Sequence, residues 1–285
     1  MKAAVRTLVI GLVFCAGNAH AESSDAKAGY HLFNPVPREM MRELNTDRPD
    51  KTESPYTVDA GHFQIEADLV TYTRDRDQAS GVKSESTSFL LSNLKVGLTN
   101  SVDLQLVVSP HERQTFTLGS QATKSNGFGD TIVRLKWNLL GNDSGDVAIG
   151  LMPFVKIPSA SSHLADKNES VEGGLIVPFA VALPHDIGLG FMFQVNRARN
   201  ESDGGNHAEF ISSATASHDL IGELAGYAEF YSESSAEAGA EWVATADAGL
   251  TYGLTTNVQL DLGANVGLTD AADDLNLFTG ISARF

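Results

Sequence analysis

Charged side chains recur singly between apolar neighbours over most of this 285-residue chain; Lys95, Asp103 and Lys136 are examples. No catalytic use is obvious for such isolated charges, but side chains of this kind set ion and solute selectivity where they line a water-filled passage. The spacing therefore predicts a polar lining made by Glu66, Asp68, Lys95, Asp103, Arg134, Lys136, Lys156, Glu229, Asp247, Asp261 and Arg284.

The order of these charges along the chain allows two interpretations. The basic residues come from segments around 95, 134–136 and 156, and most of the acidic ones from segments around 103, 229, 247 and 261. If segments adjacent in sequence are adjacent in space, the two signs occupy opposed arcs of a lumen and tune selectivity. In the other interpretation, opposite charges pair across neighbouring strands and hold the wall together.

Enzymatic signatures are absent from the sequence. It has no H-E-x-x-H, no cysteine pair and no G-x-S-x-G. The histidines are scattered without the spacing of metal ligands. We therefore predict no catalytic residues, no metal and no cofactor. An outer-membrane barrel enzyme acting on lipid or peptide stays open as an alternative, because a nucleophile and a base can converge from distant loops.

The elements that must position these charges follow from the period of the pattern. From residue 61 onward, apolar and polar residues alternate strictly, as Phe63, Ile65, Ala67 and Leu69 do. Period two marks strands with one apolar and one polar face. About twelve such segments are expected, at 63–69, 90–98, 102–108, 131–139, 147–157, 175–183, 187–195, 210–218, 224–230, 244–254, 258–268 and 277–285. Pro153 and Pro178 fall inside two of them, which suggests either a bulge or a miscounted strand there.

The connections between these segments alternate in length. Short turns are expected at 99–101, 141–145, 184–186, 219–222 and 255–257, and longer polar loops at 75–85, 111–126, 159–169, 197–206, 232–240 and 269–274. Residues 97–106 and 253–262 repeat the same turn and alternation. An even number of strands with alternating short and long connections is typical of an all-β, transmembrane, antiparallel up-and-down barrel.

Alternation alone does not say which face meets solvent. A soluble barrel would bury the polar face, and each unpaired ion in a dry core would cost several kcal/mol. A wet lumen accepts those charges while the apolar face meets lipid. Aromatic residues near segment ends, such as Trp137 and Tyr252, fit the interfacial girdles of a membrane barrel. The last segment alternates up to Phe285, a closing aromatic that resembles an outer-membrane assembly signal.

The N-terminal part of the chain has a different organisation. Residues 1–21 combine Lys2 and Arg6, a short apolar stretch and Ala19-His20-Ala21, which predicts a cleaved signal peptide. Residues 22–60 are polar and rich in proline and form an irregular extension ahead of the barrel at 61–285. Within it, Asp47, Arg48 and Asp50 are candidates for a periplasmic plug, with Arg48 pairing to Asp103 or Asp261. A disordered leader is the alternative.

Composition limits the partners. The formal net charge is −16 and becomes more negative when Lys2 and Arg6 leave with the signal. A basic face for nucleic acid is therefore not expected. Cys15, the only cysteine, lies in the predicted signal, so the mature chain has no internal disulfide.

Two motifs carry a family resemblance. Residues 44–55, LNTDRPDKTESP, followed by VDAGHFQIE at 58–66, resemble the opening of the MetA-pathway phenol-degradation family of outer-membrane transporters. Gly127-Phe128-Gly129-Asp130 with Arg134 and Lys136, and the segment around Pro178, continue the resemblance over most of the mature chain. It implies a barrel and a role in uptake of aromatic or other small compounds, and it carries over no catalytic residue.

The first hypothesis is therefore a channel or facilitator in the cell outer membrane for passive passage of small solutes, including aromatic or hydrophobic compounds. Outer-membrane lipids, the barrel assembly machinery and the solute are its expected partners. A closed structural or adhesive barrel is a further alternative, since twelve strands lie between side-chain-filled barrels of eight and open porins of sixteen.

Overall fold

The computed structural model describes residues 27–77, 80–162, 164, 170–200 and 204–285. The predicted signal peptide, residues 1–21, lies outside them. One short 3-10 helix, η1 (Arg38–Met40), precedes the strands, and no helix in the described ranges is long and apolar enough to cross a membrane. The strands are β1 (Phe63–Arg76), β2 (Lys83–Thr99), β3 (Val102–Val108), β4 (His111–Leu118), β5 (Gln121–Gly127), β6 (Thr131–Leu140), β7 (Val147–Ile157), β8 (Glu172–Leu183), β9 (Ile187–Arg199), β10 (Asn206–Ile221), β11 (Leu224–Ser235), β12 (Val243–Thr255), β13 (Val258–Gly267) and β14 (Leu275–Arg284).

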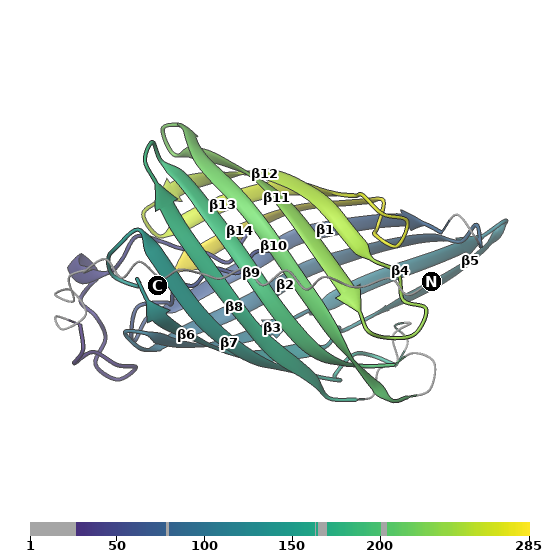
Figure 1. Cartoon of the computed structure of the whole chain (residues 1–285), viewed down its shortest axis with the longest axis horizontal. Helices are drawn as coiled ribbons and strands as arrows, with labels where there is room; N and C mark the ends of the chain where they lie inside the picture. Colours follow the sequence, from purple (N-terminus) through teal and green to yellow (C-terminus); the bar gives the residue numbers. More distant parts are fainter. Residues whose placement is uncertain (1–26, 78–79, 163, 165–169, 201–203) are drawn as a thin grey trace, which may run out of the picture.

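Twelve of these strands close into one antiparallel barrel. Each wall strand pairs with the wall strands before and after it in the chain, β3 pairs with β6, and β1 pairs with both β2 and β14, which closes the ring. Backbone groups of Phe63 and Phe285 exchange hydrogen bonds at this seam. Closure leaves the wall without an open edge, as a spanning sheet requires. Figure 1 shows the tilted strands around the lumen.

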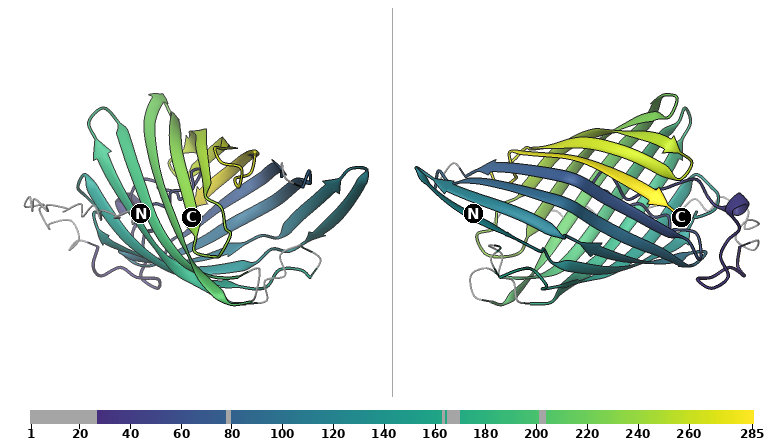
Figure 2. Two further views of the ribbon diagram at one scale, coloured as in Figure 1. Left: turned by 45° about the vertical axis from the view of Figure 1, so that its right-hand side comes forward. Right: turned by 180° about the vertical axis from the view of Figure 1, so that it is seen from behind.

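The remaining two strands, β4 and β5, form a hairpin that continues the wall beyond its rim. β4 pairs with the first half of β2, and β5 pairs only with β4. The hairpin projects from the end of the barrel opposite the C-terminus (Figures 1 and 2). The loop predicted at 111–126 is therefore wrong: the segment is β-structure. Its pattern gave no apolar face, as expected of a hairpin that projects beyond the barrel.

The join between this hairpin and β6 contains Gly127 and Gly129. Neither glycine has a positive φ, so unusual dihedrals do not explain them. Instead, a Cβ at Gly127 would lie 2.4 Å from the side chain of Ser161, and one at Gly129 would lie 2.4 Å from Oε1 of Glu112. The glycines permit a loop and a strand to pass close to this join.

Pro153 and Pro178 produce no bulge. The register of β7 against β8 is the same on both sides of Pro178, from Ile149↔Phe179 to Met152↔Ile176. The register of β6 against β7 is likewise unchanged around Pro153. Each proline omits ladder hydrogen bonds without shifting the strand, and the strand count is unaffected.

Outward and inward faces separate along every wall strand as the alternation predicts. On β3, Leu104 is 39% exposed whereas Gln105 is 0% exposed, and on β6, Leu135 is 40% exposed whereas Lys136 is 1% exposed. Large apolar side chains on the outer surface beside buried charges inside are the reverse of a soluble protein. The outer surface is therefore suited to lipid, and the chemistry of the molecule lies in its lumen.

Candidate functional site

All eleven residues predicted to line the lumen lie on the inner face of the wall. The structure brings most of them together around residues 45–59, here called the lumen segment, which runs inside the barrel. This segment leaves through the end that carries the short turns, where the purple part of the chain packs against the rim (Figure 1). The lining charges therefore face a second part of the same chain rather than an empty passage.

The basic residues Lys95, Arg134 and Lys136, here called the basic arc, lie on β2 and β6 and face carboxylates of the lumen segment. The ammonium groups of Lys95 and Lys136 both contact the carboxylate of Asp47. Nη1 of Arg134 lies 2.6 Å from Oε1 of Glu53. Lys95 also pairs with Glu66 of the neighbouring strand β1, so one cross-strand pair is present as well.

Asp47 is the centre of this contact. Burial by itself would raise the pKa of its carboxyl, but the charges of Lys136 and Lys95 outweigh burial and hold that pKa well below its usual range. The backbone N–H of Asp47 donates to both carboxylate oxygens of Glu66, and its own Oδ1 accepts from the N–H of Ser54. Asp47 is thus held ionised and fixed in position.

The acidic residues Asp68, Glu229, Asp247 and Asp261, here called the acidic arc, lie on β1, β11, β12 and β13 and face cations of the lumen segment. The guanidinium of Arg48 contacts Asp68 at 2.5 Å and Asp261 at 2.6 Å. The ammonium of Lys51 lies 3.3 Å from Asp247. Glu229 accepts from the backbone N–H of Lys51 and from the hydroxyl of Thr52.

The sequence placed Asp103 among the acidic strands, and this placement is wrong. Asp103 lies on β3, between β2 and β6 and directly opposite Lys136 in the ladder, so it belongs with the basic residues in space. It accepts from the backbone N–H of Val58 and from the amide of Gln105, whereas Arg48 contacts Asp261. Wall charges therefore lie on separate arcs, but most of their partners come from the lumen segment.

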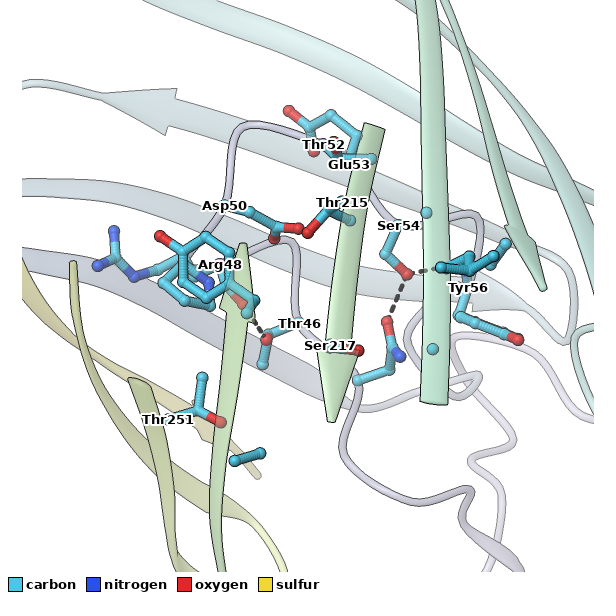
Figure 3. Close-up of a pocket in the computed structure, with 18 of the residues that line it drawn as sticks. Thr46, Arg48, Asp50, Thr52, Glu53, Ser54, Tyr56, Thr215, Ser217 and Thr251 are labelled. Carbon is cyan, nitrogen blue, oxygen red and sulfur yellow. Dashed lines mark hydrogen bonds between the residues drawn. The ribbon is translucent and has the colours of Figure 1, made fainter. Parts of the chain in front are cut away.

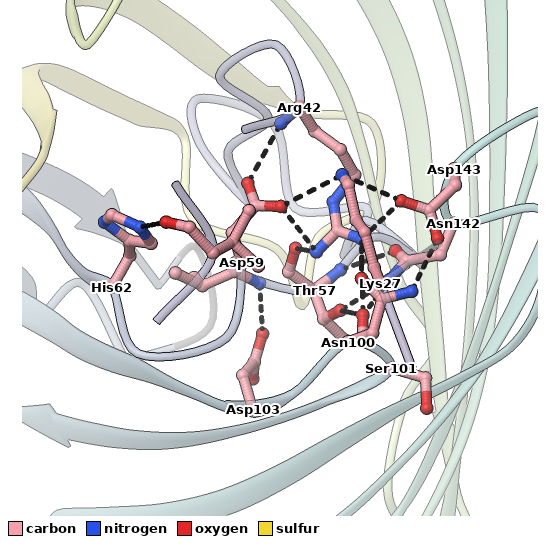
Figure 4. A network of polar contacts seen from close by, with 12 residues as sticks. Lys27, Arg42, Thr57, Asp59, His62, Asn100, Ser101, Asp103, Asn142 and Asp143 are labelled. Carbon is pink, nitrogen blue, oxygen red and sulfur yellow. Dashed lines mark hydrogen bonds and ion pairs between the residues drawn. The ribbon is translucent and has the colours of Figure 1, made fainter. Parts of the chain in front are cut away.

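A polar network ties the segment to the rim at the short turns. Arg42 donates to Asp59, Asp143 and the carbonyl of Asn100, and Lys27 reaches both Asp59 and Asp143 (Figure 4). Burial opposes ionisation of Asp143, but hydrogen bonds from Asn100 and Lys27 lower its pKa. Arg284 joins the network through Asp59 and Asn257.

The last predicted lining residue, Lys156, lies towards the opposite end of the barrel. Its ammonium pairs with Glu172 at 2.8 Å and with Asp130 at 3.7 Å. The structure therefore does not bring Lys156 together with the rest of the site.

An apolar sector of the lumen was not predicted. Met152, Ile176, Met192 and Ile211, here called the apolar arc, are buried on the inner faces of β7 to β10, with Phe154 and Tyr231 packed against them. The signal was present in 147–157, where both alternating sets of residues are apolar except for Lys156. A strand that is apolar on both faces can meet lipid outside and an apolar passage inside.

Two cavities lie on either side of residues 48–53. One, about 290 Å³, is in the half of the barrel that carries the short turns, beside Ala180, Gly190, Thr215 and Tyr227 (Figure 3). The other, about 360 Å³, is in the half that carries the long loops, beside Asp68, Asn93, Asn265 and Phe278. Arg48, Pro49, Asp50 and Glu53 line both. These four residues therefore form the partition between two water-accessible spaces.

A closed antiparallel barrel with an apolar outer face and a charged, partly hollow interior defines an outer-membrane β-barrel. The chain belongs to the family described as "Putative MetA-pathway of phenol degradation", whose profile matches residues 46–285. The protein is located in the outer membrane.

The chain is similar to solved outer-membrane proteins, and one of them, a channel, has the same fold. The COG4313 outer membrane channel from Pseudomonas putida F1 is similar with a TM-score of 0.58 and 11% identity, over 85% of this chain and 100% of that one. The translocator domain of the autotransporter NalP from Neisseria meningitidis has a TM-score of 0.48 and 11% identity, over 78% and 88%. No curated protein matches the sequence.

Proposed function

We propose that this protein is an outer-membrane channel for passive passage of small solutes, with the lumen segment as its internal constriction. The observation that carries the proposal is the pair of cavities that share Arg48, Pro49, Asp50 and Glu53 as lining residues. Each is large enough for several water molecules or a small solute. Movement of one short segment would join them into a continuous passage.

The apolar arc supports solutes with a hydrophobic part, including aromatic compounds. Met152, Ile176, Met192 and Ile211 give the lumen a wall that does not hold water tightly, opposite charged walls that do. The description of the family and the name of the Pseudomonas putida channel agree with this class of function. No part of the wall requires a catalytic role.

Residues 22–60 act as a plug rather than a leader in this proposal. Cations and anions of the lumen segment match the acidic and basic arcs, so the segment has one favoured position. The prolines at 49 and 55 stiffen it and reduce the entropy lost on docking. The short turns, and with them the plug, face the periplasm as in other outer-membrane barrels.

The proposal also includes assembly by the barrel assembly machinery. The outward residues of β14 and its closing aromatic, Phe285, alternate with inward Ser282 and Arg284. Replacing Phe285 with Asp should slow insertion, measured as loss of the heat-modifiable folded form in outer membranes. Normal insertion of that variant would remove this part of the proposal.

A closed structural barrel is the second candidate, favoured by the number of ion pairs that hold the segment. Deleting residues 22–55 from the mature chain separates the two functions. We expect a several-fold rise in single-channel conductance in planar bilayers, because the partition is removed, while the barrel still inserts. A deletion of residues 22–26, which keeps Lys27 and the lumen segment, is the matched control and should conduct like the wild type. Equal conductance of all three proteins would show that the segment does not occlude the pore.

A further inference from the structure

The acidic arc holds two places built around a positive charge. In one, the guanidinium of Arg48 lies between the carboxylates of Asp68 and Asp261 and 5.7 Å from the centroid of the Phe278 ring. In the other, the ammonium of Lys51 lies 3.3 Å from Asp247, 2.9 Å from the hydroxyl of Thr245 and 4.5 Å from the centroid of the Tyr231 ring. A carboxylate combined with an aromatic face is a recurring way to bind organic cations.

The wall is shaped for the guanidinium. Gly280 lies opposite Asp261 in the β13–β14 ladder, and a Cβ at this position would lie 2.2 Å from Nη2 of Arg48. Any side chain at position 280 would therefore fill the space that the guanidinium occupies. Because glycine has no side chain, the wall has a recess at this position, bounded by the carboxylates of Asp68 and Asp261 and by the Phe278 ring.

The arc also retains unused acceptors. Its four carboxylates face two cations in the described part of the chain, and Glu229 receives only neutral donors there. Oδ1 of Asp247 is buried, and no described residue donates a hydrogen bond to it. The hydroxyl of Tyr227, a 9% exposed residue beside the same arc, has no described partner either. Buried polar atoms of this kind ordinarily have partners.

Both places can be reached from the cavities. Arg48 lines the two cavities on either side of the partition, and Lys51 lines the second. The side chain of Lys51 is 32% exposed while that of Asp247 beneath it is 0% exposed. A solute cation entering the passage meets the edge of each place and can compete with the side chain that fills it.

We propose that these two places are binding sites for small organic cations carrying a primary ammonium or a guanidinium, filled in this structure by the chain's own Lys51 and Arg48. This inference rests on the proposed channel and names the class of solute that its acidic arc selects. Cations with an apolar group fit best, because the apolar arc adjoins Tyr231. The side chains of the plug thus stand in for the solute.

Binding of n-propylammonium to the folded protein in detergent tests the ammonium site independently of conductance. Lys51→Ala vacates the site, so we expect it to bind n-propylammonium at least tenfold more tightly than the wild type in calorimetry. Lys51→Ala combined with Asp247→Asn should lose this binding, and neutral n-propanol should show no difference among the proteins. Guanidinium with Arg48→Ala, with and without Asp261→Asn, repeats the test at the second site.

Equal binding by the wild type and Lys51→Ala, or binding unaffected by Asp247→Asn, would overturn the inference and leave the contacts as plug attachments. Heat-modifiability of each variant checks that the barrel is intact, and Lys51→Ser, which also has a short side chain and vacates the site, replaces Lys51→Ala if the latter does not insert. A channel that fails to conduct after deletion of residues 22–55 would contradict the proposed function instead, whatever the binding result.

Discussion

Two sectors of the lumen differ in the contacts that they make with the lumen segment. The charged sector, made by the basic and acidic arcs, holds the segment through buried ion pairs such as Lys136–Asp47 and Arg48–Asp261. The strands that carry the apolar arc, β7 to β10, form no ion pair with it; a Cβ at Gly150 of β7 would lie 3.3 Å from Pro55, and Ser213 of β10 shares a hydrogen bond with Thr52. The ionic contacts that position the plug therefore come from one side of the barrel.

The difference has an energetic cause. Buried opposite charges contribute little net stability compared with apolar residues, but breaking one pair is costly because it leaves an unmatched ion. The charged sector thus fixes one orientation of the segment without binding it irreversibly. The apolar sector forms no ion pairs with the segment, so its surface can contact a solute when the segment moves.

The largest expected effect comes from removing the carboxylate of Asp47. Asp47→Asn leaves Lys136 without its carboxylate partner from the segment, which should weaken docking by about 3–5 kcal/mol. Val58, which is 5% exposed in the native protein, is the position of a reporter thiol, Val58→Cys. This thiol should react with a maleimide much faster when Asp47→Asn is also present. The reporter alone is the control, and unchanged labelling would show that the charged sector does not hold the segment.

The next effect concerns the outer side of the same charged sector. Leu104→Arg places a charge towards lipid and should cost about 2–4 kcal/mol, so less folded barrel should accumulate in outer membranes. Gln259→Arg, at a half-buried inward position of β13, should insert normally. Equal insertion of the two variants would contradict the assignment of the two faces.

In the apolar sector, Ile176→Ala should reduce the stability of the barrel while leaving the segment docked. Ile176 packs with Met152, Met192 and Ile211, and truncation of such a side chain costs about 2 kcal/mol at the low end of the usual range, because the lumen can admit water. Thermal unfolding followed by circular dichroism measures the loss. Faster labelling of Val58→Cys in this variant would show that the two sectors are not independent.

The smallest effect is a pH dependence of docking. Burial, and then the carboxylate of Glu229, raises the pKa of Asp50 well above its ordinary value, although the hydroxyl of Thr215 opposes this. The protonated form therefore favours docking, and that contribution is lost as the pH rises through the raised pKa. Asp47 acts in the opposite sense, but only below its ordinary carboxyl pKa, because its own pKa is lowered.

Between neutral pH and about pH 4, the ordinary carboxyl value, the segment should accordingly dock more tightly as the pH falls. The closed fraction in single-channel records should rise in the wild type and rise less in Asp50→Asn, because burial also raises the pKa of Glu53, which still titrates in that variant. An unchanged closed fraction in the wild type would show that Asp50 does not titrate with the movement of the segment.

The sequence alone was sufficient to predict the barrel fold and the inward and outward faces of its strands. Alternation in 102–108 and 131–139 assigned Leu104 and Leu135 to the outside and Asp103 and Lys136 to the inside, since side-chain direction in a strand depends only on odd or even position. The number of wall strands and the segments that cross the membrane follow from the same local rule. The lining charges were identified for this reason, even though no motif marks them.

Tertiary structure decided what those charges face. Arg48 and Asp261 are separated by more than two hundred residues, and whether Arg48 meets Asp261 or Asp103 depends on the stagger of the strands and the path of the segment through the lumen. The apolar arc likewise exists only because β7 to β10 are adjacent in the closed ring. Period two fixes the side of the wall on which a residue lies, but distances across the lumen depend on how all twelve strands close, which no local pattern encodes.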